Sequence, residues 1–287
     1  MLKETIDGLS IKPNGVYVDV TFGGGGHSRA ILEKLGKGHL YSFDQDLEAL
    51  QNGIEDERWT FVHSNFRYLR NWMDYYGIEE IDGLLADLGV SFHHFDCPER
   101  GFSFRYPAPL DMRMNQNGKR TATDIVNSYS EDELARVFWL YGELKNGRQI
   151  AKSICKARTE KVIERTEELV EASRIPAERS KELARLFQAL RIEVNDELGA
   201  LREMLVAAKD LLKPGGRIAI LTYHSLEDRL VKNFLRSGNL EGEIEKDFYG
   251  NILTPFTLIE KGLTASDEEV ERNPRSRSAK LRVAEKK

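Results

Sequence analysis

Short apolar runs alternate with helical patterns along the chain and predict a parallel β-sheet. Helical spacing follows the first run, because Ile31, Leu32 and Leu35 share one face of a helix expected over Ser28–Leu35. Strands that alternate with helices in this way form parallel sheets, so the expected fold class is α/β. The runs that predict strands cover residues 15–22, 39–43, 59–62, 81–86 and 217–222.

A long segment without strand patterns separates the fourth predicted strand from the fifth. A crossover between parallel strands needs only about a dozen residues, so we expect an inserted helical subdomain there. A capping box at Ser130 begins one amphipathic helix, and Gly147 precedes a second. Apolar positions from Glu182 onward predict one long helix or two consecutive helices. The sheet domain is expected over 1–106 and 194–287, and the helical insertion over 107–193.

Four consecutive glycines, Gly23–Gly26, follow the first predicted strand in the stretch VDVTFGGGGHSRA. Ligands of open parallel sheets bind at the carboxyl ends of strands, where glycines let a ligand lie against bare backbone. Asp44 ends the second strand about 20 residues later, where a carboxylate can accept hydrogen bonds from ribose hydroxyls. No register supplies the last glycine of the dinucleotide fingerprint, and no Walker lysine follows. The pattern favours S-adenosylmethionine over NAD, and a flexible turn without a ligand is the alternative.

Composition and charge are typical of a globular protein that does not enter membranes. Of the 287 residues 40% are apolar, and no run of about 18 uninterrupted apolar residues exists. Cys97 and Cys155 are too few for a disulfide framework, so a cytoplasmic location is expected. The formal net charge of −5 hides a basic C-terminus, since residues 272–287 carry seven Lys or Arg and one Glu. We interpret this segment as either a solvated tail or a contact for a polyanion.

Seven blocks, which span nearly the whole chain, carry a resemblance to a known family. The blocks are TFGGGGHSRAIL (21–32), ADLGVS (86–91), ERGFSFR (99–105), PLDMRMN (109–115), FQALRIEVNDEL (187–198), KPGGRIAILTYHSLEDRLVK (213–232) and NPRSRSAKLR (273–282). In this order they resemble the signature blocks of the small-subunit ribosomal RNA cytosine-N4 methyltransferases. The resemblance implies methyl transfer from S-adenosylmethionine to the exocyclic amine of one cytidine in the decoding region of the bacterial small subunit. It also implies a class I (Rossmann-like) methyltransferase sheet with a helical insertion.

The same resemblance implies a set of cofactor contacts. In this sequence Phe66 would stack on adenine, Asp44 would hold the ribose, and Asp87 would accept from the amino end of the methionine portion. The family places a glutamine where this chain has His94, which forms fewer hydrogen bonds from one terminal group. Family members also carry a His-x-Pro-Val segment just before the equivalent of Leu2, and without it we expect weaker cofactor binding. The implied cofactor contacts are Gly25, Gly26, His27, Asp44, Phe66, Asp87 and His94.

Chemistry at cytosine requires hydrogen-bond acceptors, because N4 shares its lone pair with the ring and is a poor nucleophile. Many amino-methyltransferases place Asp/Asn-Pro-Pro-aromatic after the fourth strand, whereas this chain has Asp87-Leu88-Gly89-Val90. We therefore expect catalytic groups at Asp111, His224 and Ser225, with Asp87 as a further candidate. An ion pair with a nearby arginine is the alternative role for Asp111, and capping or packing is the alternative for His224.

Basic and aromatic residues are expected to hold the RNA. Arg100, Arg105 and Arg113 would neutralise phosphates around a flipped-out cytidine, while Phe102 or Tyr223 would stack on the base. A basic run in the insertion would either meet RNA or form a solvated helix face. It comprises Lys145, Arg148, Lys152, Lys156 and Arg158.

Other classes of function fit the sequence less well. The cluster His93–Cys97 does not predict a metal site, because adjacent residues rarely converge on one ion. A nicotinamide dehydrogenase lacks its third glycine, and a non-catalytic RNA-binding or ribosome-assembly protein with the same fold is the stronger rival. The partner predicted is small-subunit ribosomal RNA, and the sequence leaves a homodimer open.

Overall fold

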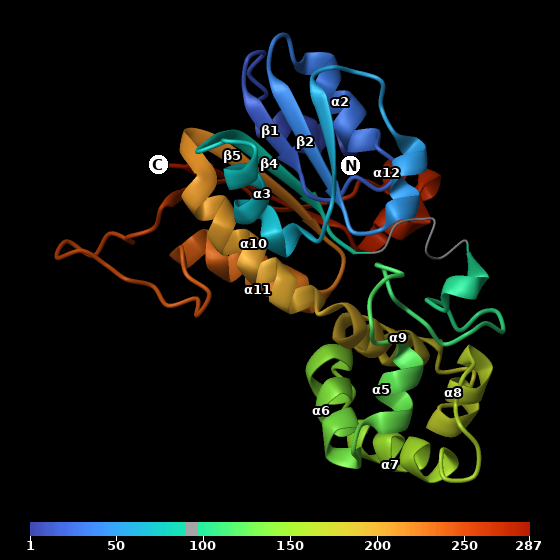
Figure 1. Ribbon diagram of the computed structural model, residues 1–287. Helices are drawn as coiled ribbons and strands as arrows, with labels where there is room; N and C mark the ends of the chain where they lie inside the picture. The colour runs from blue at the N-terminus through green and yellow to red at the C-terminus, as the bar shows by residue number, and fades with distance from the viewer. Residues whose placement is uncertain (90–96) are drawn as a thin grey trace. The chain divides into compact units, whose positions relative to one another are not determined.

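The computed structural model describes residues 1–89 and 97–287, which form two compact units (Figure 1). The first unit comprises Met1–Gly89 and Leu198–Lys287, and the second spans Val90–Glu197. Residues 97–106 and 194–197 therefore group with the second unit, whereas the sequence analysis placed them with the sheet.

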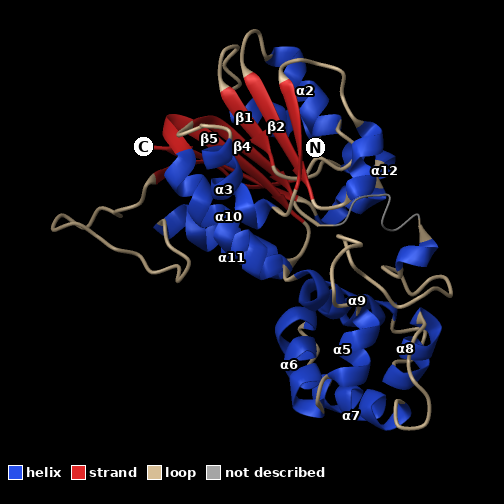
Figure 2. Cartoon of the chain, viewed as in Figure 1, coloured by secondary structure: helices blue, strands red, loops and turns tan. Residues whose placement is uncertain are grey.

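A seven-stranded sheet in the order β3-β2-β1-β4-β5-β7-β6 forms the first unit (Figure 2). The neighbours from β3 to β5 pair in parallel, and β7 lies antiparallel between β5 and β6. This confirms the predicted α/β class, and the order reverses between β1 and β4, where such sheets bind ligands. The strands are β1 (Val16–Asp19), β2 (His39–Asp44), β3 (Trp59–His63), β4 (Ile81–Asp87), β5 (Leu212–Thr222), β6 (Phe256–Thr264) and β7 (Lys280–Lys286).

Helices cover both faces of the sheet, because its strands carry apolar side chains on both sides. In β1, Val18 belongs to a core with α3, α10 and α11, whereas its neighbour Tyr17 belongs to a core with α1 and α2. Successive residues of a strand point to opposite faces, which explains this division. The helices of this unit are α1 (Leu2–Leu9), α2 (Gly26–Lys34), α3 (Leu69–Tyr75), α10 (Glu197–Leu211), α11 (Ser225–Ser237) and α12 (Asp267–Arg272), with short 3-10 turns at η1 (Leu47–Asn52), η2 (Phe66–Tyr68) and η4 (Pro274–Ser278).

The C-terminal segment forms an integral strand, which corrects its interpretation as a solvated tail. β7 pairs with β5 on one side and β6 on the other. Leu281 and Val283 are at most 1% exposed, and Arg282 Nε donates to Asp228 Oδ1 over 2.8 Å. At least this basic side chain therefore neutralises a carboxylate of the chain itself.

The second unit consists of helices and connecting loops (Figure 2). A separate apolar core holds these helices together. The predicted capping box at Ser130 is confirmed, since Ser130 N donates to Glu133 Oε2 over 2.7 Å and Glu133 N donates to Ser130 Oγ over 3.3 Å. Asp196 has a φ of 47°, so the apolar pattern from Glu182 onward forms two helices, α9 and α10. The second unit contains η3 (Pro98–Arg100), α5 (Ala122–Ser128), α6 (Glu131–Gly142), α7 (Gly147–Ala157), α8 (Thr166–Ser173) and α9 (Ser180–Asn195).

Contacts at both ends of the second unit explain why it is larger than predicted. Phe102 is 5% exposed and belongs to the helical core. Asn195 Nδ2 donates to the carbonyl oxygen of Met112, and Asn195 Oδ1 accepts from the amide of Met114, each over 2.8 Å. These residues therefore fold with the helices.

Within residues 1–89 and 97–287, no helix combines the length and the apolar character needed to cross a membrane.

Replacing Leu281 by Ala tests the role of β7 in stability. Removal of a fully buried leucine side chain costs about 2–5 kcal/mol, because it loses apolar burial and leaves a cavity. We expect a loss of that size in the free energy of unfolding measured with urea. Leu263→Ala on β6, where the side chain is 38% exposed, is the control and should cost about 0.5 kcal/mol or less. Equal effects of the two substitutions would contradict a buried β7.

Candidate functional site

The glycine loop lies between the end of β1 and the start of α2. Gly25 has a φ of 73°, in the left-handed region that glycine adopts without strain. A Cβ atom on Gly25 would lie 2.5 Å from Arg29 Nη1 and 3.0 Å from the ring of Phe22. Around Gly24 and Gly26, in contrast, an added Cβ would meet no atom of the described residues within 4 Å. The loop therefore needs glycine at one position for its own folding and leaves open space beside two others.

A buried carboxylate at the end of β1, Asp19, holds this loop. Asp19 Oδ1 accepts from the amide of Thr21 over 3.1 Å, and Asp19 Oδ2 accepts from Ser28 Oγ over 2.7 Å. Ser28 Oγ also lies 2.8 Å from Ser42 Oγ on β2, and Thr21 Oγ1 accepts from the amide of Asp87 on β4 over 2.6 Å. Burial raises the pKa of Asp19 above its usual value, and the neighbouring His27 and the hydrogen bonds from Ser28 and Thr21 offset this rise only in part. The network ties the loop to three strands.

Asp44 and Phe66 lie at the ends of the next two strands. Asp44 Oδ2 accepts from the amide of Gly23 over 2.8 Å, and Asp44 Oδ1 accepts from the amide of Asp46 over 2.9 Å. Phe66 begins η2 after β3 and packs half-buried against the core of the sheet. Because β1, β2 and β3 are parallel neighbours, the loop, Asp44 and Phe66 share the carboxyl edge of the sheet.

Asp87 ends β4 and contacts side chains from two other elements. His27 Nδ1 of α2 lies 3.5 Å from Asp87 Oδ2, and Tyr223 Oη, just after β5, donates to Asp87 Oδ1 over 2.7 Å. Burial raises the pKa of Asp87, while His27 and Tyr223 act in the opposite direction. His27 Nε2 is buried and has no hydrogen-bond partner among the described residues. Since buried polar atoms are usually paired, this nitrogen indicates a place for a ligand's polar group.

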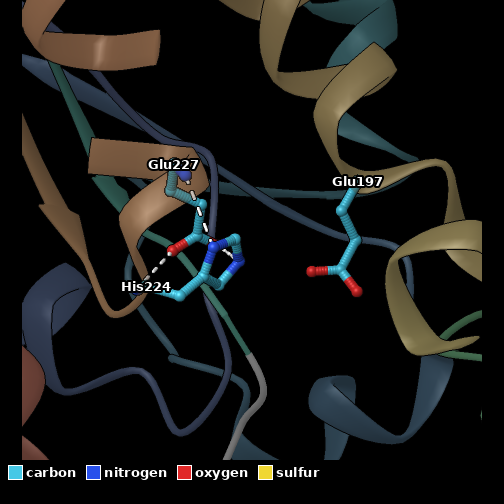
Figure 3. Close-up of side chains that lie close together, drawn as sticks. All are labelled: Glu197, His224 and Glu227. Carbon is cyan, nitrogen blue, oxygen red and sulfur yellow. Dashed lines mark hydrogen bonds and ion pairs between the residues drawn. The ribbon is translucent and has the colours of Figure 1, made fainter. Parts of the chain in front are cut away.

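His224 and Glu227 form the N-terminal cap of α11 (Figure 3). The amide of Glu227 donates to His224 Nδ1 over 3.4 Å, and His224 Nε2 lies 3.1 Å from Glu227 Oε1. Glu227 is 3% exposed and its Oε2 accepts from the amide of Tyr223 over 3.0 Å. The capping role that was the alternative for His224 is thus present, and Ser225 is exposed at the first position of α11.

In the second unit, Asp111 forms a bidentate ion pair with Arg113. Arg113 Nε and Nη2 donate to Asp111 Oδ1 and Oδ2 over 2.8 and 2.7 Å. Partial burial raises the pKa of Asp111, but the hydrogen bonds from Arg113 outweigh it and hold the pKa below its usual value. The ion pair that was the alternative role for Asp111 is therefore formed.

The other predicted RNA contacts of this unit differ in exposure. Arg100 is 7% exposed, and its Nη2 donates to the carbonyl oxygens of Arg113 and Met114 over 2.9 and 3.1 Å. Phe102 is buried in the helical core, whereas Arg105 is exposed. Burial leaves Phe102 no open face for stacking on a base in this conformation. The predicted cofactor contact His94 lies outside the described residues.

Comparison with known proteins identifies the family. The family model of the MraW methylase family matches residues 1–287. The chain belongs to the MraW methylase family. Three proteins named ribosomal RNA small subunit methyltransferase H are similar to it over 100% of this chain and 96% of their own length. They come from Parabacteroides distasonis (60% identical), Phocaeicola vulgatus (58%) and Christiangramia forsetii (51%).

Two residues that shape the candidate site of this MraW methylase family member were not predicted from the sequence. Asp19 supports the glycine loop, and Glu227 holds the backbone of Tyr223. A charged residue inside the β-branched run GVYVDVTF was a usable signal for Asp19, because an unpaired charge is rarely buried in a strand. No comparable signal existed for Glu227, which lies beside Asp228 in an amphipathic helix.

Gly25→Ala tests the loop geometry in this family member. The substitution forces an alanine into a left-handed conformation, which costs about 1–2 kcal/mol, and adds the close contacts with Arg29 and Phe22. Gly77→Ala is the matched control, since Gly77 has a φ of 69° and open space around its Cβ position. We expect thermal unfolding to show a larger loss of stability for Gly25→Ala. A smaller loss than in the control would contradict the crowded loop.

Proposed function

We propose that this chain transfers a methyl group from S-adenosylmethionine to the exocyclic N4 amine of a cytidine in small-subunit ribosomal RNA. Its full-length relatives at 51–60% identity are named for methylation of that subunit's RNA. The observation that carries the proposal is the group of polar side chains at the carboxyl edge of β1, β2 and β4, beside an open glycine loop. The resemblance of the sequence blocks implies a target in the decoding region, and a ribosomal substrate supports the expected cytoplasmic location.

The residues at this edge fit the parts of S-adenosylmethionine. Asp44 has a carboxylate directed at the loop and suits ribose hydroxyls, while Phe66 offers an aromatic ring for adenine. Asp87 suits the ammonium group of the methionine portion, and the unpaired His27 Nε2 suits a further polar atom. When bound, this cofactor supplies a methyl group on a positively charged sulfur.

The chain must also make the cytosine amine reactive. Acceptors for the N4 hydrogens would draw electron density toward nitrogen and hold the amine in place. Of the three predicted groups, Asp111 forms an ion pair with Arg113, His224 caps α11, and Ser225 is the first residue of α11. Ser225 is the candidate we favour for contact with the amine because its side chain is exposed, whereas Asp111 and His224 are partly buried.

The helical unit and the basic residues supply the proposed RNA contacts. Lys152 and Lys156 lie one helical turn apart on α7 and are exposed, as is Arg105. Exposed cations at this spacing can neutralise successive phosphates of one strand.

Replacement of Asp44 by Ala tests the cofactor assignment. The wild-type chain, incubated with S-adenosylmethionine and unmodified small ribosomal subunits, should form N4-methylcytidine detectable by mass spectrometry after digestion. Loss of a charged hydrogen-bond acceptor costs about 1.5–3 kcal/mol, so Asp44→Ala should weaken cofactor binding about tenfold or more.

The control is Glu57→Ala, which removes an exposed acid of the same unit and should change nothing. If the wild-type chain binds cofactor and RNA but forms no product, a non-catalytic RNA-binding function replaces the proposal. Binding of NADH instead of S-adenosylmethionine would support the alternative function of a nicotinamide dehydrogenase.

Asp111→Ala separates a catalytic role from a structural one. A catalytic Asp111 predicts a fall in turnover of about a hundredfold with cofactor affinity unchanged. A purely structural ion pair predicts lower thermal stability, because Arg113 loses its partner, and little change in turnover per folded molecule. Steady-state kinetics together with thermal unfolding distinguish the two, and an equal loss of turnover and cofactor affinity would contradict the catalytic assignment.

A further inference from the structure

Tyr223 is fixed at both its backbone and its hydroxyl. Its amide donates to the buried Glu227 Oε2 over 3.0 Å, and its hydroxyl donates to Asp87 Oδ1 over 2.7 Å. The ring lies close to Gly89, where an added Cβ would be 3.5 Å from Tyr223 Cδ2. A side chain held at both ends in this way has little freedom to swing onto a base.

The hydrogen bond from Tyr223 orients the carboxylate of Asp87. Tyr223 occupies Oδ1, while Oδ2 faces His27 at 3.5 Å and the Asp87 amide is anchored on Thr21 Oγ1 at 2.6 Å. A carboxylate has about four lone-pair directions, so these contacts fix its plane and still leave acceptor capacity. The free capacity is suited to an ammonium group, which donates up to three hydrogen bonds.

We propose that Tyr223 is a positioning residue whose hydroxyl holds the Asp87 carboxylate in the orientation that binds the amino end of the cofactor. This role replaces the stacking of Tyr223 on the target base expected from the sequence. It rests on the proposed function, because it takes Asp87 as the contact for the methionine portion. The two roles affect different ligands. A positioning residue affects binding of the cofactor, whereas a stacking residue affects binding of the RNA.

Tyr223→Phe separates the two roles, since phenylalanine keeps the ring and loses only the hydroxyl. Titration calorimetry with S-adenosylhomocysteine should show a Kd about tenfold higher than in the wild-type chain, while the KM for ribosomal subunits should stay within about twofold. Tyr249→Phe is the matched control, because Tyr249 is 86% exposed, and it should change neither value. A stacking residue would leave both values unchanged in Tyr223→Phe, which would overturn the proposal.

The pH dependence of cofactor binding supplies a second readout. Asp87 binds an ammonium group in its charged form, so affinity is lost as pH falls through its pKa, which the Tyr223 hydrogen bond lowers. The acid limb of the binding profile should therefore move to higher pH in Tyr223→Phe. The other charged groups that act on Asp87, namely His27, Glu227, Asp19 and the N-terminal ammonium, are the same in both proteins. A purely structural role would lower the unfolding temperature without moving this limb.

A double-mutant cycle keeps the test decisive if Tyr223→Phe also lowers stability. In an Asp87→Asn background the hydroxyl has lost its charged acceptor, so Tyr223→Phe should weaken binding no further. Additive losses would show that Tyr223 acts independently of Asp87 and would overturn the proposal. If the wild-type chain itself does not bind S-adenosylhomocysteine, the proposed function fails, a result that is distinguishable from failure of the Tyr223 role alone.

Discussion

The geometry of the carboxyl edge of the sheet depends on the hydrogen bonds that the buried carboxylate of Asp19 accepts. It lies where β1 ends and accepts hydrogen bonds from the amide and the hydroxyl of Thr21 and from the hydroxyl of Ser28 in the first turn of α2. Through Ser28 and Thr21 the same network reaches β2 and β4. A buried carboxylate is tolerated only when it is hydrogen-bonded, so Asp19 and the residues that donate to it must fold together. Asp19 thereby converts a flexible run of glycines into a loop of defined shape.

The parallel part of the sheet was predictable because both of its faces are buried. Such strands are rich in apolar residues, and β1, β2 and β4 are largely buried along their length, while β3 at the edge of the sheet is only partly buried. Each predicted run overlaps the observed strand. β7 escaped prediction because its apolar residues Leu281 and Val283 are separated by Arg282 and lie in a segment rich in Lys and Arg. Its pairing depends on β5 and β6, which are distant in sequence, and local patterns carry no information on such partners.

The site was predictable in part, for a related reason. Gly25, Asp44 and Asp87 stand at strand ends, and strand order alone brings strand ends together. Strand order does not predict whether a given side chain is exposed, buried or paired with another. Phe102 was expected on the surface and packs into the helical core, because its environment is set by helices that follow it in the chain. The pairing of Asp111 with Arg113 was open from sequence, since only the turn geometry decides whether two neighbouring charges meet.

The electrostatics of the edge favour a cationic ligand. Burial raises the pKa of both Asp19 and Asp87. His27, hydrogen bonds from hydroxyls and a backbone amide, and for Asp87 the N-terminal ammonium only partly offset this rise. A positive charge placed beside Asp87 would lower its raised pKa and be held by the carboxylate, so binding and ionisation support each other. S-adenosylmethionine carries one positive charge more than the product left after methyl transfer. That charge lies on sulfur and is separate from the ammonium group proposed for Asp87, which cofactor and product share, so Asp87 is expected to stabilise the binding of both.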